Sequence, residues 1–173
     1  QEEKELIMER ILTRVAWLVG LLLVQILLLN KIYLFGLATP FVYVYFILAL
    51  DKEVDRNTLM LLAFALGLVV DVFCNTPGVN AGASVLLAFS RERLLRLFVP
   101  REEFENFEPS IRSMGIWPFL RYVFVAVLLH HTALFLLEAF SFSHIGYLLL
   151  RILCSALLTV MLVMSIEFVR HRR

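Results

Sequence analysis

The chain has 173 residues, of which 61% are hydrophobic and 18% are charged. An average soluble domain is only about 45–50% apolar, so a soluble fold of this size would leave much apolar surface in water. The 16 Lys and Arg and the 15 Asp and Glu give a net charge of +1, which argues against a nucleic-acid-binding surface. We therefore expect an all-α integral membrane protein, one domain over 1–173, whose surroundings are membrane lipid.

Apolar blocks about as long as a bilayer core is thick predict the membrane spans. The first span covers 11–29 and follows a glutamate-rich start that is unlike a removable signal peptide. The second covers 33–50, and Pro40 inside it predicts a separate or kinked piece in its first turns. The third covers 58–73, is short, and carries Asp71 near its end.

A concentration of turn formers over 74–82 predicts a tight reversal before the fourth span. That span, 79–97, loses its apolar character at Arg91. We expect the arginines at 91, 93 and 96 to reach the lipid headgroups from a continuing helix. Mixed charged and apolar residues over 98–116 predict a cytoplasmic loop or an interfacial segment.

The fifth span, 117–137, and the sixth, 146–168, are the clearest, with aromatic residues near their ends as interfacial anchors. If six spans cross the membrane, fourteen Lys and Arg fall on one side and only Lys31 falls on the other. Such a bias marks the cytoplasmic side. We therefore expect about six transmembrane helices with both termini in the cytoplasm.

Three charged residues lie at or near the outer ends of these spans: Asp71, Glu138 and Arg151. An unpaired cation costs roughly 2.5–3.5 kcal/mol at the bilayer centre on insertion scales, and less toward the interface. We therefore expect Arg151 to pair with Asp71 or Glu138 and to tie the outer ends of the helices together. The alternative is a polar floor for a ligand that enters from outside.

His130 and His131 lie near the middle of the fifth span, about 100° apart around the helix, so one can face the bundle and the other something else. No partner at helical spacing completes a metal site, so we expect interior polar groups and neither metal nor cofactor. Gly82-Ala83-Ser84-Val85 is a little similar to the Gly-x-Ser-Gly of rhomboid proteases, but Val85 replaces the second glycine. A serine and a histidine without geometry make no triad, so we expect no catalytic residue.

Two pairs of small residues have the spacing that lets helix backbones approach closely. Ala16 and Gly20 form one pair in the first span, and Ala63 and Gly67 form the other in the third. They predict a packing face, either inside the bundle or for the helix of a partner.

Five features in chain order carry a likeness to a known family. They are Gln25, Pro40, the run 45–50, Gly67-Leu68-Val69-Val70-Asp71-Val72-Phe73, and Pro77-Gly78-Val79-Asn80-Ala81. Together with the size, the span count and the cytoplasmic ends, they resemble the rod shape-determining protein MreD. Two departures are Asp51 after Leu50, where the family often has Leu-Pro, and a charged stretch over 91–112 that looks longer than usual.

The resemblance implies a non-enzymatic scaffold of the cell-wall elongation machinery in the bacterial inner membrane. Its implied partners are the bitopic protein MreC, the actin-like filament MreB, and the elongation transglycosylase and transpeptidase. The candidate structural or interaction residues are Gly67, Asp71, Pro77, Gly78, Asn80, Arg151, Glu138, Ala16 and Gly20.

The family is also similar in fold to the substrate-binding S components of energy-coupling-factor vitamin transporters, which implies an S-component-like bundle and a rival function. Asp71, Asn75 and Asn80 near the outer mouth suit either role, because a ligand pocket needs a few convergent polar groups. The outer loops are short and poor in charge, which leaves little for a ligand-capping lid. The sequence therefore favours the scaffold.

Overall fold

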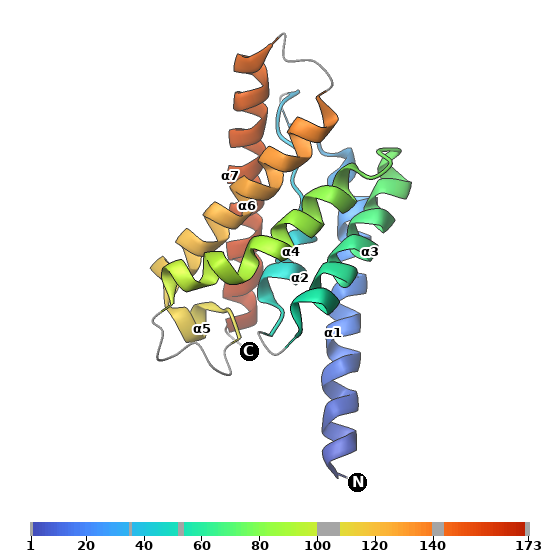
Figure 1. Ribbon diagram of the computed structural model, residues 1–173, viewed down its shortest axis with the longest axis vertical. Helices are drawn as coiled ribbons and strands as arrows, with labels where there is room; N and C mark the ends of the chain where they lie inside the picture. The colour runs from blue at the N-terminus through green and yellow to red at the C-terminus, as the bar shows by residue number, and fades with distance from the viewer. Residues whose placement is uncertain (1, 35, 52–53, 100–107, 140–143, 172–173) are drawn as a thin grey trace.

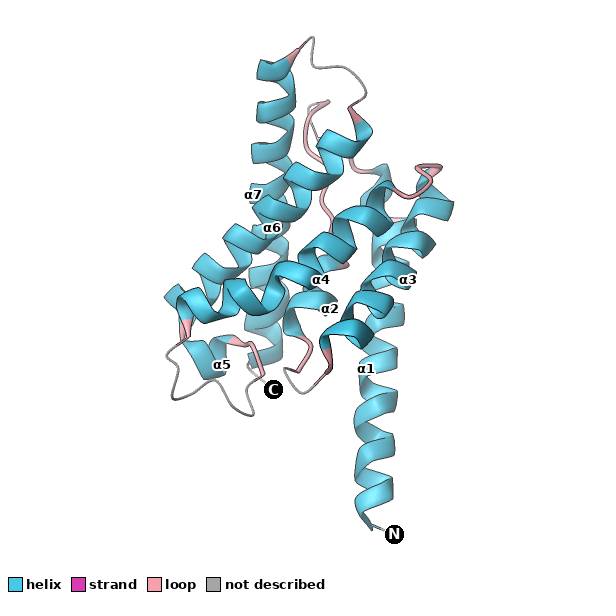
Figure 2. Ribbon diagram, viewed as in Figure 1, coloured by secondary structure: helices cyan, strands magenta, loops and turns pink. Residues whose placement is uncertain are grey.

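The computed structural model describes residues 2–34, 36–51, 54–99, 108–139 and 144–171. The described chain is helical, with loops but no strands between the helices (Figures 1 and 2). The elements are α1 (Glu2–Leu27), the 3₁₀ helix η1 (Leu29–Lys31), α2 (Val44–Ala49), α3 (Arg56–Cys74), α4 (Val79–Phe98), α5 (Ile111–Met114), α6 (Ile116–Glu138) and α7 (Ile145–His171).

Four helical stretches of the described chain are long and apolar enough to cross a membrane. They are Leu12–Lys31, Arg56–Cys74, Ile116–Glu138 and Ile145–Arg170. They coincide with the first, third, fifth and sixth of the spans expected from the sequence. The chain is therefore an all-helical membrane protein with four candidate membrane-spanning helices.

The second expected span, 33–50, differs from the prediction because it is not one helix. Only α2 is α-helical there, and the chain from 37 to 43 is extended or turned. Pro40 lacks the N–H that a helix interior needs and restricts the residue before it. The piece before α2 is therefore separate, as one of the two expected forms, but it is not helical.

The fourth expected span is α4, a continuous helix of 20 residues. Its second half carries charged side chains over 91–96, which sets it apart from the four apolar helices. Its expected continuation past Arg91 is present. The expected segment 98–116 is described only in part: α5 lies within it, whereas 100–107 lie outside the described residues.

The helices form a layered bundle whose two chain ends point the same way (Figure 1). α3 and α4 pack as a hairpin, α4 crosses α6, and α6 packs along α7. The first turns of α1 extend beyond the rest of the bundle, toward the end where the C-terminus also lies. The turn between α3 and α4 lies at the opposite end.

The extended segment 37–43 runs through the protein interior, where Val42 and Tyr43 are buried. Buried backbone groups outside a helix need other hydrogen-bond partners. Side chains supply them: Thr159 Oγ1 accepts from the N–H of Phe41 at 3.1 Å, and Ser155 Oγ accepts from that of Thr39 at 3.0 Å. α7 therefore holds the segment from one side.

Gln25 of α1 holds the same segment from another side. Its Oε1 accepts from the N–H of Val42 at 2.8 Å, and its Nε2 donates to the carbonyl of Pro40 at 3.0 Å. Gln25 is fully buried, so these bonds replace the water contacts that the amide lost. Two of the features behind the family resemblance, Gln25 and Pro40, thus contact each other.

Candidate functional site

The hairpin between α3 and α4 is closed by the carboxylate of Asp71, which is only 2% exposed. Its Oδ1 accepts from the backbone N–H and the side-chain Nδ2 of Asn80 at 2.9 and 3.0 Å, and from Thr76 Oγ1 at 2.8 Å. Its Oδ2 accepts from the N–H of Ala81 at 2.9 Å. The first N–H groups of a helix have no partner within the helix and favour a negative charge. Asp71 therefore caps α4 from α3.

Gly67 lies one turn before Asp71 and lets the two helix backbones meet. A Cβ at this position would lie 2.6 Å from both the carbonyl oxygen of Asn80 and the Cα of Ala81. Those atoms are backbone, so they cannot move aside as a flexible side chain would. Close approach here requires glycine. We call Gly67, Asp71 and Asn80 the hairpin clamp.

The turn that joins the two helices needs both Pro77 and Gly78. The N–H of Val79 donates to the carbonyl of Thr76 at 3.1 Å, and Gly78 has φ +84° and ψ −7°. This is a type II turn, in which proline suits the second position and glycine the third. Asn75 ends α3 in the left-handed region at φ 56°. The residues of this region that carry the resemblance thus share one structural task, which is to close the hairpin. They are Gly67, Asp71, Pro77, Gly78 and Asn80.

A buried tyrosine hydroxyl extends the clamp into the interior. Tyr43 donates to Asn80 Oδ1 at 3.2 Å and accepts from Ser84 Oγ at 3.2 Å. His130 Nε2 lies 3.0 Å from the same hydroxyl. Ser84 and His130 therefore meet only through Tyr43, whose hydroxyl lies between them.

His131 bonds to α7, whereas His130 bonds to Tyr43 just before α2. The Nε2 of His131 lies 3.1 Å from Thr159 Oγ1 of α7, and its Nδ1 lies 2.9 Å from the carbonyl of Val127. Both histidines are fully buried and hydrogen-bonded, as expected of interior polar groups, and they face different elements. Within the described residues, no group of three or more His, Cys, Asp and Glu is placed to hold a metal ion.

Of the two partners considered for Arg151, the structure has Glu138. Arg151 Nη2 lies 3.1 Å from Glu138 Oε1, and the guanidinium stacks over the Phe135 ring at 4.3 Å. Asp71 instead accepts hydrogen bonds within the hairpin of α3 and α4. The pair joins the last turn of α6 to the second turn of α7, as expected of a tie between helix ends.

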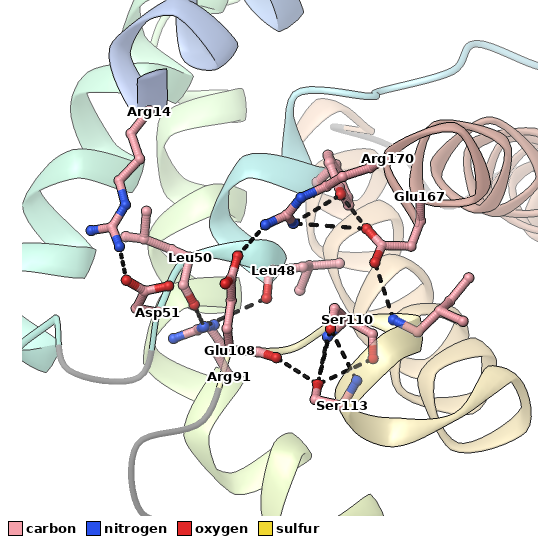
Figure 3. A network of polar contacts seen from close by, with 12 residues as sticks. Arg14, Leu48, Leu50, Asp51, Arg91, Glu108, Ser110, Ser113, Glu167 and Arg170 are labelled. Atoms are coloured by element: carbon pink, nitrogen blue, oxygen red, sulfur yellow. Dashed lines mark hydrogen bonds and ion pairs between the residues drawn. The ribbon is translucent and has the colours of Figure 1, made fainter. Parts of the chain in front are cut away.

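A second polar network lies near the end of the bundle where the termini lie (Figure 3). Arg91 is 3% exposed and donates to the carbonyls of Leu48 and Leu50 at the C-terminal end of α2, the former at 3.5 Å. Cations favour helix C-termini because the last carbonyls there are unpaired. The expectation that Arg91 reaches lipid headgroups is therefore wrong, because Arg91 points into the protein.

Glu167 is the residue of this network that sequence reasoning missed. It is 2% exposed, its Oε1 accepts from the N–H of Ile111 at 3.0 Å, and its Oε2 accepts from the hydroxyl of Tyr45. It therefore caps α5 from α7. A lone carboxylate in the last apolar turns of 146–168 was the available signal, since such groups rarely lie in a span without partners.

An apolar groove runs between α1 and α7, with a volume of about 700 Å³. Its lining residues are Thr13, Ala16, Trp17, Gly20, Leu21, Val24, Leu29, Val42, Leu162 and Ile166. Ala16 is exposed, and a Cβ built on Gly20 would meet nothing within 4 Å. The small pair of α1 therefore faces open space in this chain, unlike Gly67.

These features define an all-helical membrane protein with a capped hairpin, an extended segment held by side chains, and an open lateral groove. In comparisons with known proteins, no family model, no curated protein and no solved structure matches the chain. The functional argument therefore rests on the sequence and on the geometry of the described residues.

Proposed function

We propose that this chain is an MreD-like, non-enzymatic scaffold of the cell-wall elongation machinery in the bacterial inner membrane. Its role is to bind the bitopic protein MreC and so help position MreB, the transglycosylase and the transpeptidase. The observation that carries the scaffold role is the open groove beside Ala16 and Gly20. A helix face of small residues in an apolar groove suits the close approach of another helix.

The family assignment is supported by the shared task of its recognisable residues. Gly67, Asp71 and Asn80 form the hairpin clamp, and Pro77 and Gly78 form its turn. Gln25 and Pro40 form a second contact that fixes the extended segment. Residues that resemble a family motif and also depend on one another in space are better support than the same residues scattered.

In this proposal the chain crosses the membrane six times, because α4 and the segment that ends in α2 are each long enough to add a crossing to the four apolar helices. α4 has 20 residues, which at about 1.5 Å each span about 30 Å, the thickness of a bilayer core. The stretch 38–43 reaches up to about 20 Å at about 3.3 Å per residue, and the six residues of α2 add about 9 Å. Backbone outside a helix is tolerated at membrane depth where protein surrounds it. Both termini are then cytoplasmic, a placement that the distribution of Lys and Arg supports.

The rival proposal is the substrate-binding S component of a vitamin transporter. Its outer pocket would draw on Asp71 and Asn80, but both are engaged with each other and with Thr76. A ligand would have to break the cap of α4 to reach them. The same groove that suits MreC also suits the helix of a transporter's coupling subunit, so the identity of the partner decides between the two.

The test is affinity purification in mild detergent from the native membrane, with co-purifying proteins identified by mass spectrometry. We expect MreC and the wall-synthesis enzymes with the wild type, and a loss of MreC with Gly20→Leu, which fills the groove. Gly146→Leu is the matched control, because Gly146 is also a helical glycine with nothing near its Cβ position. Recovery of a coupling subunit with ATPases would refute the scaffold.

A further inference from the structure

A second cavity adjoins the apolar groove near the end of the molecule where the termini lie. It has a volume of about 530 Å³ and shares Thr13, Trp17 and Leu21 with the groove, so the two form one continuous cleft. We call this cavity the polar chamber. Its charged lining residues are Glu9, Arg14, Asp51, Glu108 and Arg170.

The charges of the polar chamber favour a cation. Three carboxylates face two guanidinium groups, which gives a net charge of −1. Arg14 is paired with Asp51, and Arg170 is paired with Glu108 (Figure 3). Among the described residues, none forms an ion pair with Glu9. An entering cation therefore meets an open carboxylate, whereas an entering anion meets arginines that are already paired.

One stripe of α1 joins the polar chamber to the groove. Glu9, Thr13, Ala16 and Gly20 follow one another at intervals of four, three and four residues, so they lie on one face of the helix. Glu9 and Ala16 are seven residues apart, about 10 Å along the axis. A helix that packs on Ala16 and Gly20 therefore brings its flanking residues, two turns away, to Glu9.

We propose that the polar chamber receives the Lys or Arg residues that flank the partner's membrane helix on the cytoplasmic side. This inference rests on the proposed function, because it takes the partner helix to lie in the groove. Cytoplasmic flanks of membrane helices are rich in Lys and Arg, which is the chemistry that the chamber accepts. Trp17 lines both cavities and offers an aromatic face to the same cations.

The partner's position follows from this geometry. The apolar part of its helix lies against Ala16 and Gly20, and its basic flank lies against Glu9 and the chamber's ion pairs. The groove supplies close packing, and the chamber fixes the depth at which the helix is seated. Complementary charge also disfavours helices whose cytoplasmic flank is acidic, which gives the scaffold a means of selecting among membrane helices.

The experiment reverses the charge at the open carboxylate. Glu9→Lys is purified in mild detergent beside the wild type and Glu92→Lys, a control with the same change of charge at a residue of α4 that does not line the chamber. We expect Glu9→Lys to lower MreC recovery about fivefold, with a weaker effect at high salt, and Glu92→Lys to leave it unchanged. Replacing the basic flank of MreC by Glu should restore binding to Glu9→Lys. Size-exclusion elution verifies that each variant is folded.

The outcomes separate this inference from the function beneath it. If the wild type recovers no MreC, the proposed function fails. If the wild type recovers MreC and the two charge reversals recover it equally, the polar chamber plays no part and this inference alone is overturned. A loss of MreC that no change in its flank restores, together with a phospholipid in the wild-type mass spectrum that is absent from Glu9→Lys, would show that the chamber holds lipid instead.

Discussion

The two small-residue pairs have the same spacing in the sequence and opposite surroundings in the structure. Ala63 is buried, and Gly67 lies against the backbone of α4, where a Cβ would be 2.6 Å from backbone atoms. Ala16 is exposed, and Gly20 faces an open groove. The spacing therefore predicts that a helix face can be closely approached, but not whether the approaching helix belongs to the same chain.

The largest expected effect is at the closed pair. Gly67→Ala adds a Cβ about 2.6 Å from backbone atoms of α4, so the hairpin must open. We expect a destabilisation of about 3 kcal/mol or more, measured by thermal unfolding in detergent. Gly20→Ala is the control, with a change below about 0.5 kcal/mol. Equal stability of the two variants would remove the distinction between the closed and the open pair.

The second effect is at the cap of α4. Asp71→Asn keeps the shape of the side chain but turns one oxygen into a donor that faces another N–H group. We expect a loss of about 2–3 kcal/mol, because the bonds lost are to a buried charge. Hydrogen exchange of the first turn of α4 should rise selectively. A uniform rise over all helices would contradict a role confined to the hairpin.

A smaller effect is expected where the clamp continues inward. Tyr43→Phe removes a hydroxyl shared by Asn80, Ser84 and His130 while it keeps the buried ring. We expect a loss of about 1–2 kcal/mol in unfolding free energy. Ser84→Ala removes only one of these contacts and should cost less. The reverse order would mean that the hydroxyl does not join the clamp to the interior.

The smallest effect is at the partly exposed ion pair of Arg151 and Glu138. Arg151→Leu should cost under about 1 kcal/mol, because partly exposed pairs contribute little. Combined with Asp71→Asn, the two losses should add, since Arg151 pairs with Glu138 and shares no partner with Asp71. Folded yield and unfolding temperature of the single and double variants measure this. A non-additive loss would show coupling between the ion pair and the clamp.

Four long apolar helices were predictable from the sequence, because a membrane crossing by helix leaves a block of fixed length. The reversal over 74–82 was predictable from its turn residues. The extended segment 37–43 was not, because its backbone is satisfied by Ser155 and Thr159, more than a hundred positions away. Sequence periodicity reports the spacing of residues that are close in the chain and not contacts between distant ones.

The candidate residues divide in the same way. Asp71 and Arg151 stood out because a charge in an apolar block needs a partner. The partner of Arg151, Glu138, was one of the two considered, whereas the bonds from Asp71 to Asn80 and Ala81 were not predicted. Arg91 was misassigned, because an arginine at the end of an apolar block has the same sequence signal whether it reaches water or a buried carbonyl. The position of α2 determines which of the two Arg91 reaches. The sequence did not reveal that position, because α2 lies within the predicted span 33–50 after Pro40.

The extended segment also determines when, during synthesis, this part of the fold can be completed. Its backbone bonds come from Gln25, already synthesised, and from Ser155 and Thr159 of the last helix. Until α7 emerges from the ribosome, the N–H groups of Thr39 and Phe41 lack these partners, and bare backbone is costly in lipid. The segment 37–43 therefore gains its full set of backbone partners only after α7 has been made, so α7 completes the folding of the N-terminal half.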